Sequence, residues 1–127
     1  MTEYAILLPD DEDKWAQLDT DARRQTYANH VRFMELLTER GHQLVGGAEL
    51  THSRTATVVR GTLDRATVTE GPYAESVEQL SGFYLVRTDD LADLQQLCGL
   101  LAGRGAVEIR EVVPSSNPDV DPGRAQD

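Results

Sequence analysis

The chain has 127 residues, of which 39% are hydrophobic, and this size suits one domain with a modest core. Its formal net charge of −10 argues against nucleic acids and anionic membranes as partners, because both require clustered Lys and Arg. The single cysteine allows no disulfide within the chain, and we find neither a secretory signal nor an apolar run of about 20 residues. We therefore expect a soluble cytoplasmic protein.

The first part of the chain predicts a strand followed by a helix. Residues 4–8 (YAILL) form an apolar run typical of a buried strand, which Pro9 should end. After an acidic loop or short helical turn, a helix is expected from Thr20 or Asp21, both good N-caps, to Gly41. Its apolar face should carry the residues spaced by three and four, namely Tyr27, His30, Val31, Met34 and Leu37.

The middle of the chain predicts a strand and a hairpin. Residues 42–51 are typical of a strand in which the paired Gly46 and Gly47 indicate a bulge. Residues 55–60 and 66–70 flank the short sequence GTLD and predict a β-hairpin.

The last part predicts a strand over residues 82–87, a helix within 88–105 and a strand over 106–113. The apolar stripe of this helix comprises Leu91, Leu94, Cys98 and Leu101, so we expect Cys98 to belong to the core. Residues 114–127 contain three prolines and should form a flexible tail, which leaves residues 1–113 as the domain. The order β-α-β, hairpin, β-α-β predicts an α+β, ferredoxin-like split βαβ fold with an inserted hairpin and both helices on one face of an antiparallel sheet.

The second face of this sheet should not be exposed to water. In residues 4–8 and 82–87 the apolar residues do not alternate with polar ones, as they would if one face were solvated. Covering such a face removes apolar surface from water at about 25 cal/mol per Å². We therefore predict a homodimer through sheet-to-sheet packing around a two-fold axis.

Two kinds of residue are candidates for proton-transfer chemistry. His30 lies on or beside the apolar stripe of the first helix, where it could act as a general base or be a packed histidine bonded to a backbone carbonyl. Glu70 and Glu75 flank a Gly-Pro turn, where they could divide a proton between them or brace the loop through backbone N–H groups. We take His30 and Glu70 as the catalytic candidates.

The turn itself predicts a rigid rim for a ligand pocket. Gly71 permits positive φ and Pro72 restricts the following φ, which together aim Tyr73 and Glu75. Tyr73 could line the pocket or seal the dimer interface. Gly47, at the bulge, is expected to lie near the same pocket. No His, Cys or Asp set has the spacing of a metal site, and no nucleotide-binding pattern is present, so we assign neither a metal nor a cofactor.

The stretch EGPYAESVEQLSGFYLVRTDDLADL, with FMELLTERGHQLVGGAELT before it and GAVEIREVVP after it, resembles the YCII-related family and in particular its DGPF-motif branch. Three positions depart from the motif: Glu70 replaces its Asp, Tyr73 its Phe, and Ser81 a common Gly. The resemblance implies a dimeric α+β barrel. It also implies a small-molecule pocket, because some relatives are enzymes acting on ring compounds, in which a His and an acid are proposed to move protons. Many other members of the family have no known activity, and some are encoded beside sigma factors.

Three functions remain open at this point. The chain could be a cofactor-independent enzyme acting on a small cyclic or carbonyl compound, with His30 moving a proton and Glu70 orienting it or acting as the acid. It could be a non-catalytic dimer that binds a small ligand or a protein partner, linked to transcriptional regulation by its genomic neighbours. It could also be a dimer whose cavity is filled by side chains. Convergence of His30 with Glu70 or Glu75 beside a cavity would favour the first of these.

Overall fold

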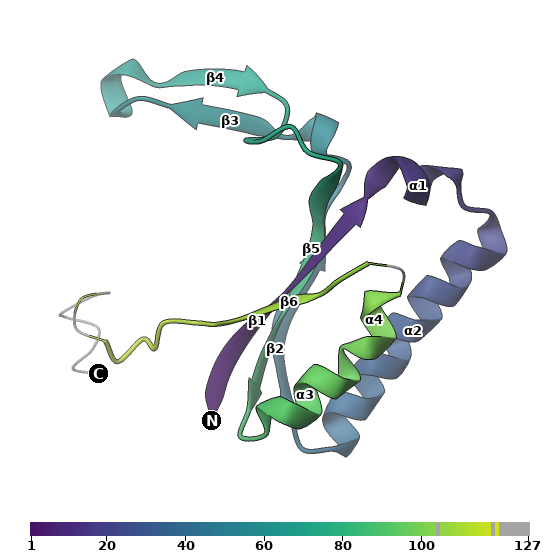
Figure 1. Ribbon diagram of the computed structural model, residues 1–127. Coiled ribbons are helices and arrows are strands. Elements are labelled where there is room, and N and C mark those ends of the chain that lie inside the picture. Colours follow the sequence, from purple (N-terminus) through teal and green to yellow (C-terminus); the bar gives the residue numbers. More distant parts are fainter. Residues whose placement is uncertain (104, 118, 120–127) are drawn as a thin grey trace.

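The computed structural model describes residues 1–103, 105–117 and 119. Its main layer is a four-stranded antiparallel sheet in the order β2-β5-β1-β6. The strands are β1 (Thr2–Asp11), β2 (Gln43–Glu49), β5 (Glu78–Thr88) and β6 (Glu108–Glu111). The helices are α1 (Glu12–Gln17), α2 (Thr20–Glu39), α3 (Leu91–Leu97) and α4 (Gly99–Ala102). Helices α2, α3 and α4 cover one face of the sheet (Figure 1), so the predicted α+β class is confirmed.

The core lies between the helices and this covered face of the sheet. Five of its side chains are fully buried, namely Ile6, Phe33, Leu37, Val86 and Leu94. Leu97 and Cys98, each 4% exposed, complete the cluster and confirm the prediction that Cys98 belongs to the core. Among the described residues, no helix combines the length and the apolar character needed to cross a membrane.

The buried face of α2 agrees with the predicted one at Leu37 but is rotated away from Tyr27 and Val31. Phe33 is fully buried, whereas Val31 is 51% and Tyr27 47% exposed. The stripe that meets the sheet passes through His30, Phe33 and Leu37, and Val31 lies one residue off it. The helix begins at Thr20 as expected, but its cap is one residue earlier, where the Asp19 side chain accepts a hydrogen bond from the Ala22 N–H at 2.8 Å.

Two further elements differ from prediction, and one irregularity agrees with it. Pro9 does not end the first strand but lies within β1, at a register shift between Leu8 and Pro9. A proline is tolerated there because β6 pairs only with residues 4–7 of β1, which leaves the other edge of Pro9 without a neighbouring strand. The second helix is divided at Cys98 into α3 and α4. The register of β2 shifts between Leu44 and Gly46, which confirms the predicted bulge.

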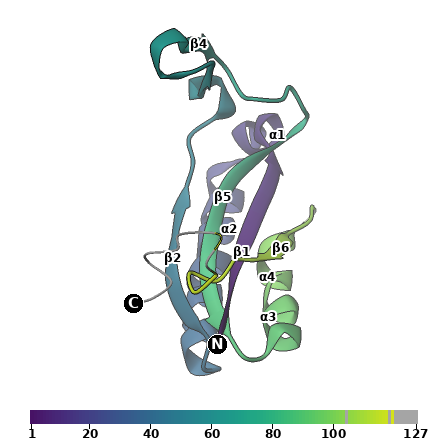
Figure 2. The ribbon, with the colours of Figure 1, turned by 90° about the vertical axis from the view of Figure 1, so that its left-hand side faces the viewer.

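A two-stranded hairpin projects from the sheet. It consists of β3 (Thr57–Arg60) and β4 (Thr67–Glu70), with short 3₁₀ turns η1 (Ser53–Thr55) before it and η2 (Leu63–Arg65) at its tip. We call residues 56–71 the arm, because the Gly71 N–H donates to the Ala56 carbonyl at 2.8 Å and closes its base. The arm extends away from the helices, on the side of the uncovered sheet face (Figure 1, Figure 2).

The uncovered face of the sheet is apolar at its centre. Strand register places five side chains together on it, namely Ala5, Leu7, Ala48, Phe83 and Leu85. Residues 112–117 also extend to this side of the sheet (Figure 1). The flexible tail was predicted over residues 114–127, of which the structure describes 114–117 and 119. The rest of that prediction lies outside the described residues.

Candidate functional site

The Gly-Pro turn forms one wall of a groove at the root of the arm. The groove has a volume of about 720 Å³, and Glu70, Gly71, Pro72 and Glu75 line it, so four residues predicted for the site come together. Gly71 adopts φ +100°, a conformation that residues with a side chain rarely adopt, and this turns the chain at the end of β4. Tyr73 is 84% exposed and is not one of the lining residues.

The opposite wall comes from the acidic segment that follows β1. Glu12, Asp13 and Lys14 of α1 line it, together with the neighbouring Asp11. The 3₁₀ turn η1 and its N-cap residue add His52, Ser53 and Arg54. The lining therefore carries five carboxylates against two permanent cations, which favours a ligand rich in hydrogen-bond donors or positive charge.

Glu12 fixes this wall. Its carboxylate accepts hydrogen bonds from the Ser53 N–H at 2.6 Å and from the Ser53 hydroxyl, and it lies 3.8 Å from Nδ1 of His52. Burial would raise the pKa of Glu12, but the hydrogen bonds from Ser53 and the positive field of His52 and Arg54 outweigh it, so the pKa lies below its usual value. Glu12 is thus an ionised anchor that holds η1 against α1. The expected short helical turn in this acidic run is present as α1, but no role was predicted for Glu12.

His30 lies in a different place, between α2 and the sheet. Its Nδ1 is 2.6 Å from the hydroxyl of Tyr84 on β5, and the two rings are tilted by 35° with centroids 5.8 Å apart. Gly47 pairs with Tyr84 in the sheet, and a Cβ at Gly47 would lie 3.0 Å from Cδ1 of the Tyr84 ring. The absence of a side chain at Gly47 therefore lets the Tyr84 ring lie close to β2.

A second polar pair stands beside the first. Tyr27, one turn before His30 on α2, donates from its hydroxyl to Oε1 of Glu49 at 2.8 Å. Burial lowers the pKa of His30, and the negative charge of Glu49 opposes this shift. The pKa of Tyr84 is raised by burial and then by Glu49. At neutral pH the imidazole of His30 is therefore neutral and the phenol of Tyr84 is protonated.

The two clusters are separate, so the convergence of His30 with Glu70 or Glu75 that was expected of an enzyme is not found among the described residues. Within residues 1–103, 105–117 and 119, no hydrogen bond or ion pair joins His30 to Glu70 or Glu75, and His30 does not line the groove. The partners of His30 are Tyr84, which is bonded to it, and Glu49, which acts through its charge. Neither was predicted for the site. Both residues lie on strands that pack against α2, the helix that carries His30. Their position could have indicated the contact, but only with knowledge of the strand register, which the sequence does not provide.

The model of the YCII-related domain family matches residues 2–116. The chain belongs to the YCII-related family. Comparison with curated proteins gave no match. The match covers both the His30 pair and the arm with its groove, so neither feature lies outside the domain that defines the family.

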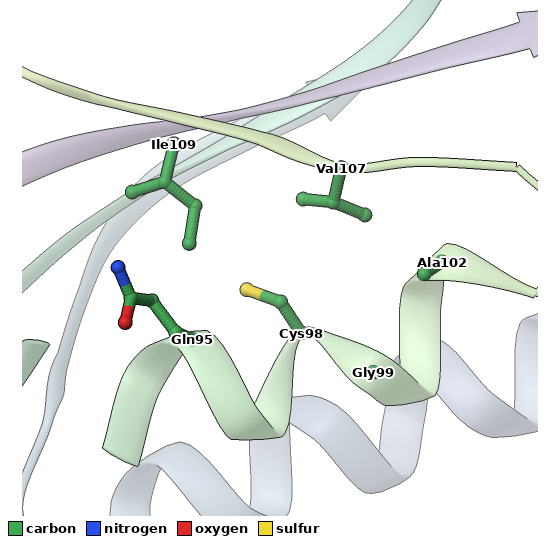
Figure 3. A pocket seen from close by; sticks show the side chains of 6 residues that line it. All are labelled: Gln95, Cys98, Gly99, Ala102, Val107 and Ile109. Atoms are coloured by element: carbon green, nitrogen blue, oxygen red, sulfur yellow. The ribbon is translucent and has the colours of Figure 1, made fainter. Parts of the chain in front are cut away.

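This YCII-related protein has a further pocket of about 380 Å³, which lies between helices α3 and α4 on one side and residues 107–109 on the other. Figure 3 shows the Cys98 side chain pointing into the gap toward Ile109 and Val107. Burial raises the pKa of the Cys98 thiol to about 11, so the thiol stays protonated at neutral pH and is a poor nucleophile. This pocket therefore shows apolar packing around a core cysteine.

His42 has a structural role at the far end of the sheet. It is buried, with Nδ1 2.7 Å from the Thr88 hydroxyl and Nε2 2.7 Å from Oδ2 of Asp93, while Arg40 donates to Oδ1 of the same carboxylate at 2.8 Å. The hydrogen bond from His42 lowers the pKa of Asp93 despite some burial, and Arg40 adds to the effect. The network joins α3 to the start of β2 and the end of β5. Among the described residues, no group of three or more His, Cys, Asp or Glu is arranged to hold a metal ion.

Proposed function

We propose that this protein is a cofactor-independent enzyme that moves a proton on a small cyclic or carbonyl compound, with His30 as the base. The observation that supports it best is the hydrogen bond of 2.6 Å between Nδ1 of His30 and the Tyr84 hydroxyl. This contact orients the ring, and among the described residues Nε2 has no hydrogen-bond partner. A neutral imidazole with one nitrogen held and the other without a partner has a lone pair that can accept a proton from a substrate.

The proposed step uses the tautomer with its proton on Nδ1. This N–H donates to the Tyr84 oxygen, and Nε2 then accepts a proton from the carbon next to a carbonyl group, leaving an enolate. The carboxylate of Glu49 favours the imidazolium that forms, in agreement with the direction in which it shifts the pKa of His30. Return of the proton to another atom of the enolate completes an isomerisation. In this scheme Tyr84 is a positioning residue, and the acid predicted at Glu70 is replaced by Glu49.

We further propose that the enzyme is a cytoplasmic homodimer in which the uncovered sheet faces pack together. The strand order β2-β5-β1-β6 is that of a ferredoxin-like split βαβ sheet, and the apolar centre around Leu7, Phe83 and Leu85 supports sheet-to-sheet packing into a dimeric α+β barrel. The Glu-Gly-Pro-Tyr sequence at residues 70–73 supports assignment to the DGPF branch.

The test is proton exchange in D₂O, followed by NMR on a panel of cyclic ketones and lactones. The wild-type protein should exchange α-protons of at least one compound, with a rate that rises with pH and has a midpoint below the usual histidine value of 6.5. His30→Gln should slow exchange about 100-fold or more, because general base catalysis contributes on the order of 10²–10⁴. His52→Gln, which changes a histidine of the groove, is the matched control and should exchange normally. Full exchange by His30→Gln, or none by the wild type, would exclude the proposal.

A second candidate is a non-catalytic dimer that binds a small ligand, in keeping with a regulatory role. The groove of about 720 Å³ at the root of the arm supports it, because five carboxylates line the groove and His30 does not reach it. Calorimetric titration with 1,4-diaminobutane and related amines would test this function. Binding that is lost in the Glu70→Gln, Glu75→Gln double variant but kept in His30→Gln would support the groove as the functional site, and equal binding by both variants would exclude it.

A further inference from the structure

The arm carries apolar side chains that its own protomer does not cover. Val59 and Val68 face each other across the hairpin register and are 62% and 64% exposed. Leu63 at the tip is 97% exposed. Apolar side chains grouped on a projecting element, rather than scattered singly, indicate a contact surface.

The arm also lacks support of its own. Its two strands make their extensive contacts only with each other among the described elements. An isolated two-stranded hairpin is at best marginally stable in water. Its root is nevertheless held in place, because the Leu50 N–H donates to the Ser81 carbonyl at 2.8 Å and Ser53 is bonded to Glu12. The arm thus has a fixed base and an uncovered outer part.

The two uncovered surfaces are accessible from the same direction. The arm and the uncovered sheet face lie on the same side of the molecule, opposite the helices (Figure 1). The centre of that face is apolar, and near it Arg87 donates to Glu3 at 3.0 Å, so opposite charges are already paired within one protomer. Two chains of net charge −10 repel each other, and only contacts that are apolar or internally neutralised bring them together at low cost.

We propose that the arm of each protomer packs against the second copy in the dimer, so that the partner covers the face of the arm formed by Val59 and Val68. This inference rests on the sheet-to-sheet dimer of the proposed function and adds a second contact to it. Because Glu70 and Gly71 belong to both the arm and the groove, the dimer partner then also holds one wall of the groove in place. Ligand binding in the groove and dimer formation should therefore strengthen each other.

The experiment measures the dimer dissociation constant of the full chain by sedimentation on dilution. Val59→Asp places a charge in the proposed contact and should weaken the dimer about tenfold or more. Thr67→Asp makes the matched change on the opposite face of the arm, since Thr67 pairs with Arg60, and should leave the dimer constant unchanged. If the wild type is monomeric, both the dimer and the arm contact are excluded. If it is dimeric and Val59→Asp dimerises as tightly as Thr67→Asp, only the arm contact is excluded.

Amide hydrogen exchange of the unmodified chain provides a second measurement that does not depend on how a variant folds. The amides of β3 and β4 should exchange at least about tenfold more slowly in the concentrated dimer than after dilution to the monomer, because covered hydrogen bonds open less often. Equal exchange of these amides in the two states would overturn the proposal.

Discussion

Replacing Gly47 by alanine should both destabilise the protein and disturb the His30 site. A Cβ built at this position lies 2.6 Å from the Phe83 carbonyl oxygen and 3.0 Å from Cδ1 of Tyr84. Ordinary contact begins at 3.4 Å, so β2 and β5 would have to separate by about 0.8 Å. The obstacle is backbone rather than the end of a flexible side chain. We therefore expect the free energy of unfolding to fall by about 1–3 kcal/mol, the usual cost of overpacking.

The neighbouring glycine provides the control. A Cβ at Gly46 meets no atom within 4 Å, and its φ is not in the left-handed region. Gly46→Ala should therefore leave stability unchanged or raise it by about 0.4–1 kcal/mol, because alanine restricts the unfolded chain. The two variants make the same chemical change at adjacent positions of one strand.

Urea unfolding of both variants measures the stability difference, and an NMR titration of the His30 imidazole measures the effect on the site. In Gly47→Ala the displaced Tyr84 ring should admit water to His30, so the pKa of His30 should rise toward its usual value. Equal unfolding midpoints for Gly46→Ala and Gly47→Ala would refute the packing argument. If Gly47→Ala loses the expected free energy of unfolding but the pKa of His30 stays the same, the link between Gly47 and the His30 site is refuted.

Three further predictions concern the core, the His42 network and the root of the arm. Phe33→Ala should lower the free energy of unfolding by about 3–5 kcal/mol, whereas Val31→Ala should change it by less than about 0.5 kcal/mol. Urea unfolding measures both values, and similar losses for the two variants would contradict the observed buried face of α2. The pKa of Asp93 is lower in the folded state than in the unfolded chain. The ionised carboxylate therefore stabilises the fold fully above pH 3.8, the usual pKa, and this stabilisation is lost as the pH falls through the lower pKa of the folded state. Asp93→Asn should therefore be less stable than the wild type at neutral pH and lose less stability on acidification, and an unchanged acid dependence would argue against this assignment. Ser53→Ala removes the hydroxyl, one of the two Ser53 groups that donate to Glu12 at the root of the arm, and leaves the backbone N–H in place. Amide exchange across η1 should accelerate, and unaltered exchange would show that the hydroxyl is not needed as an anchor.

The site was harder to predict than the elements that carry it. His30 and the Gly-Pro turn were each identified from local chemistry, but their grouping into one site was inferred without a distance. The structure instead pairs His30 with Tyr84, 54 residues away in the chain, and brings the turn next to Glu12. Both pairings depend on strand register and on the path of the chain at the root of the arm, and neither leaves a periodic signal in the sequence.

The amino-acid sequence by itself determined the order of the strands and of the main helical regions, the hairpin, a bulge beside the paired glycines and the burial of Cys98. These features follow from interactions between residues close together in the chain, such as apolar spacing, caps and the conformational freedom of glycine. Only the tertiary structure decided which face of α2 is buried, how Pro9 is accommodated within β1, and which group contacts His30. The physical reason is that these outcomes depend on which strands become neighbours, and a shift of one residue in register would move every side chain of a strand to the other face.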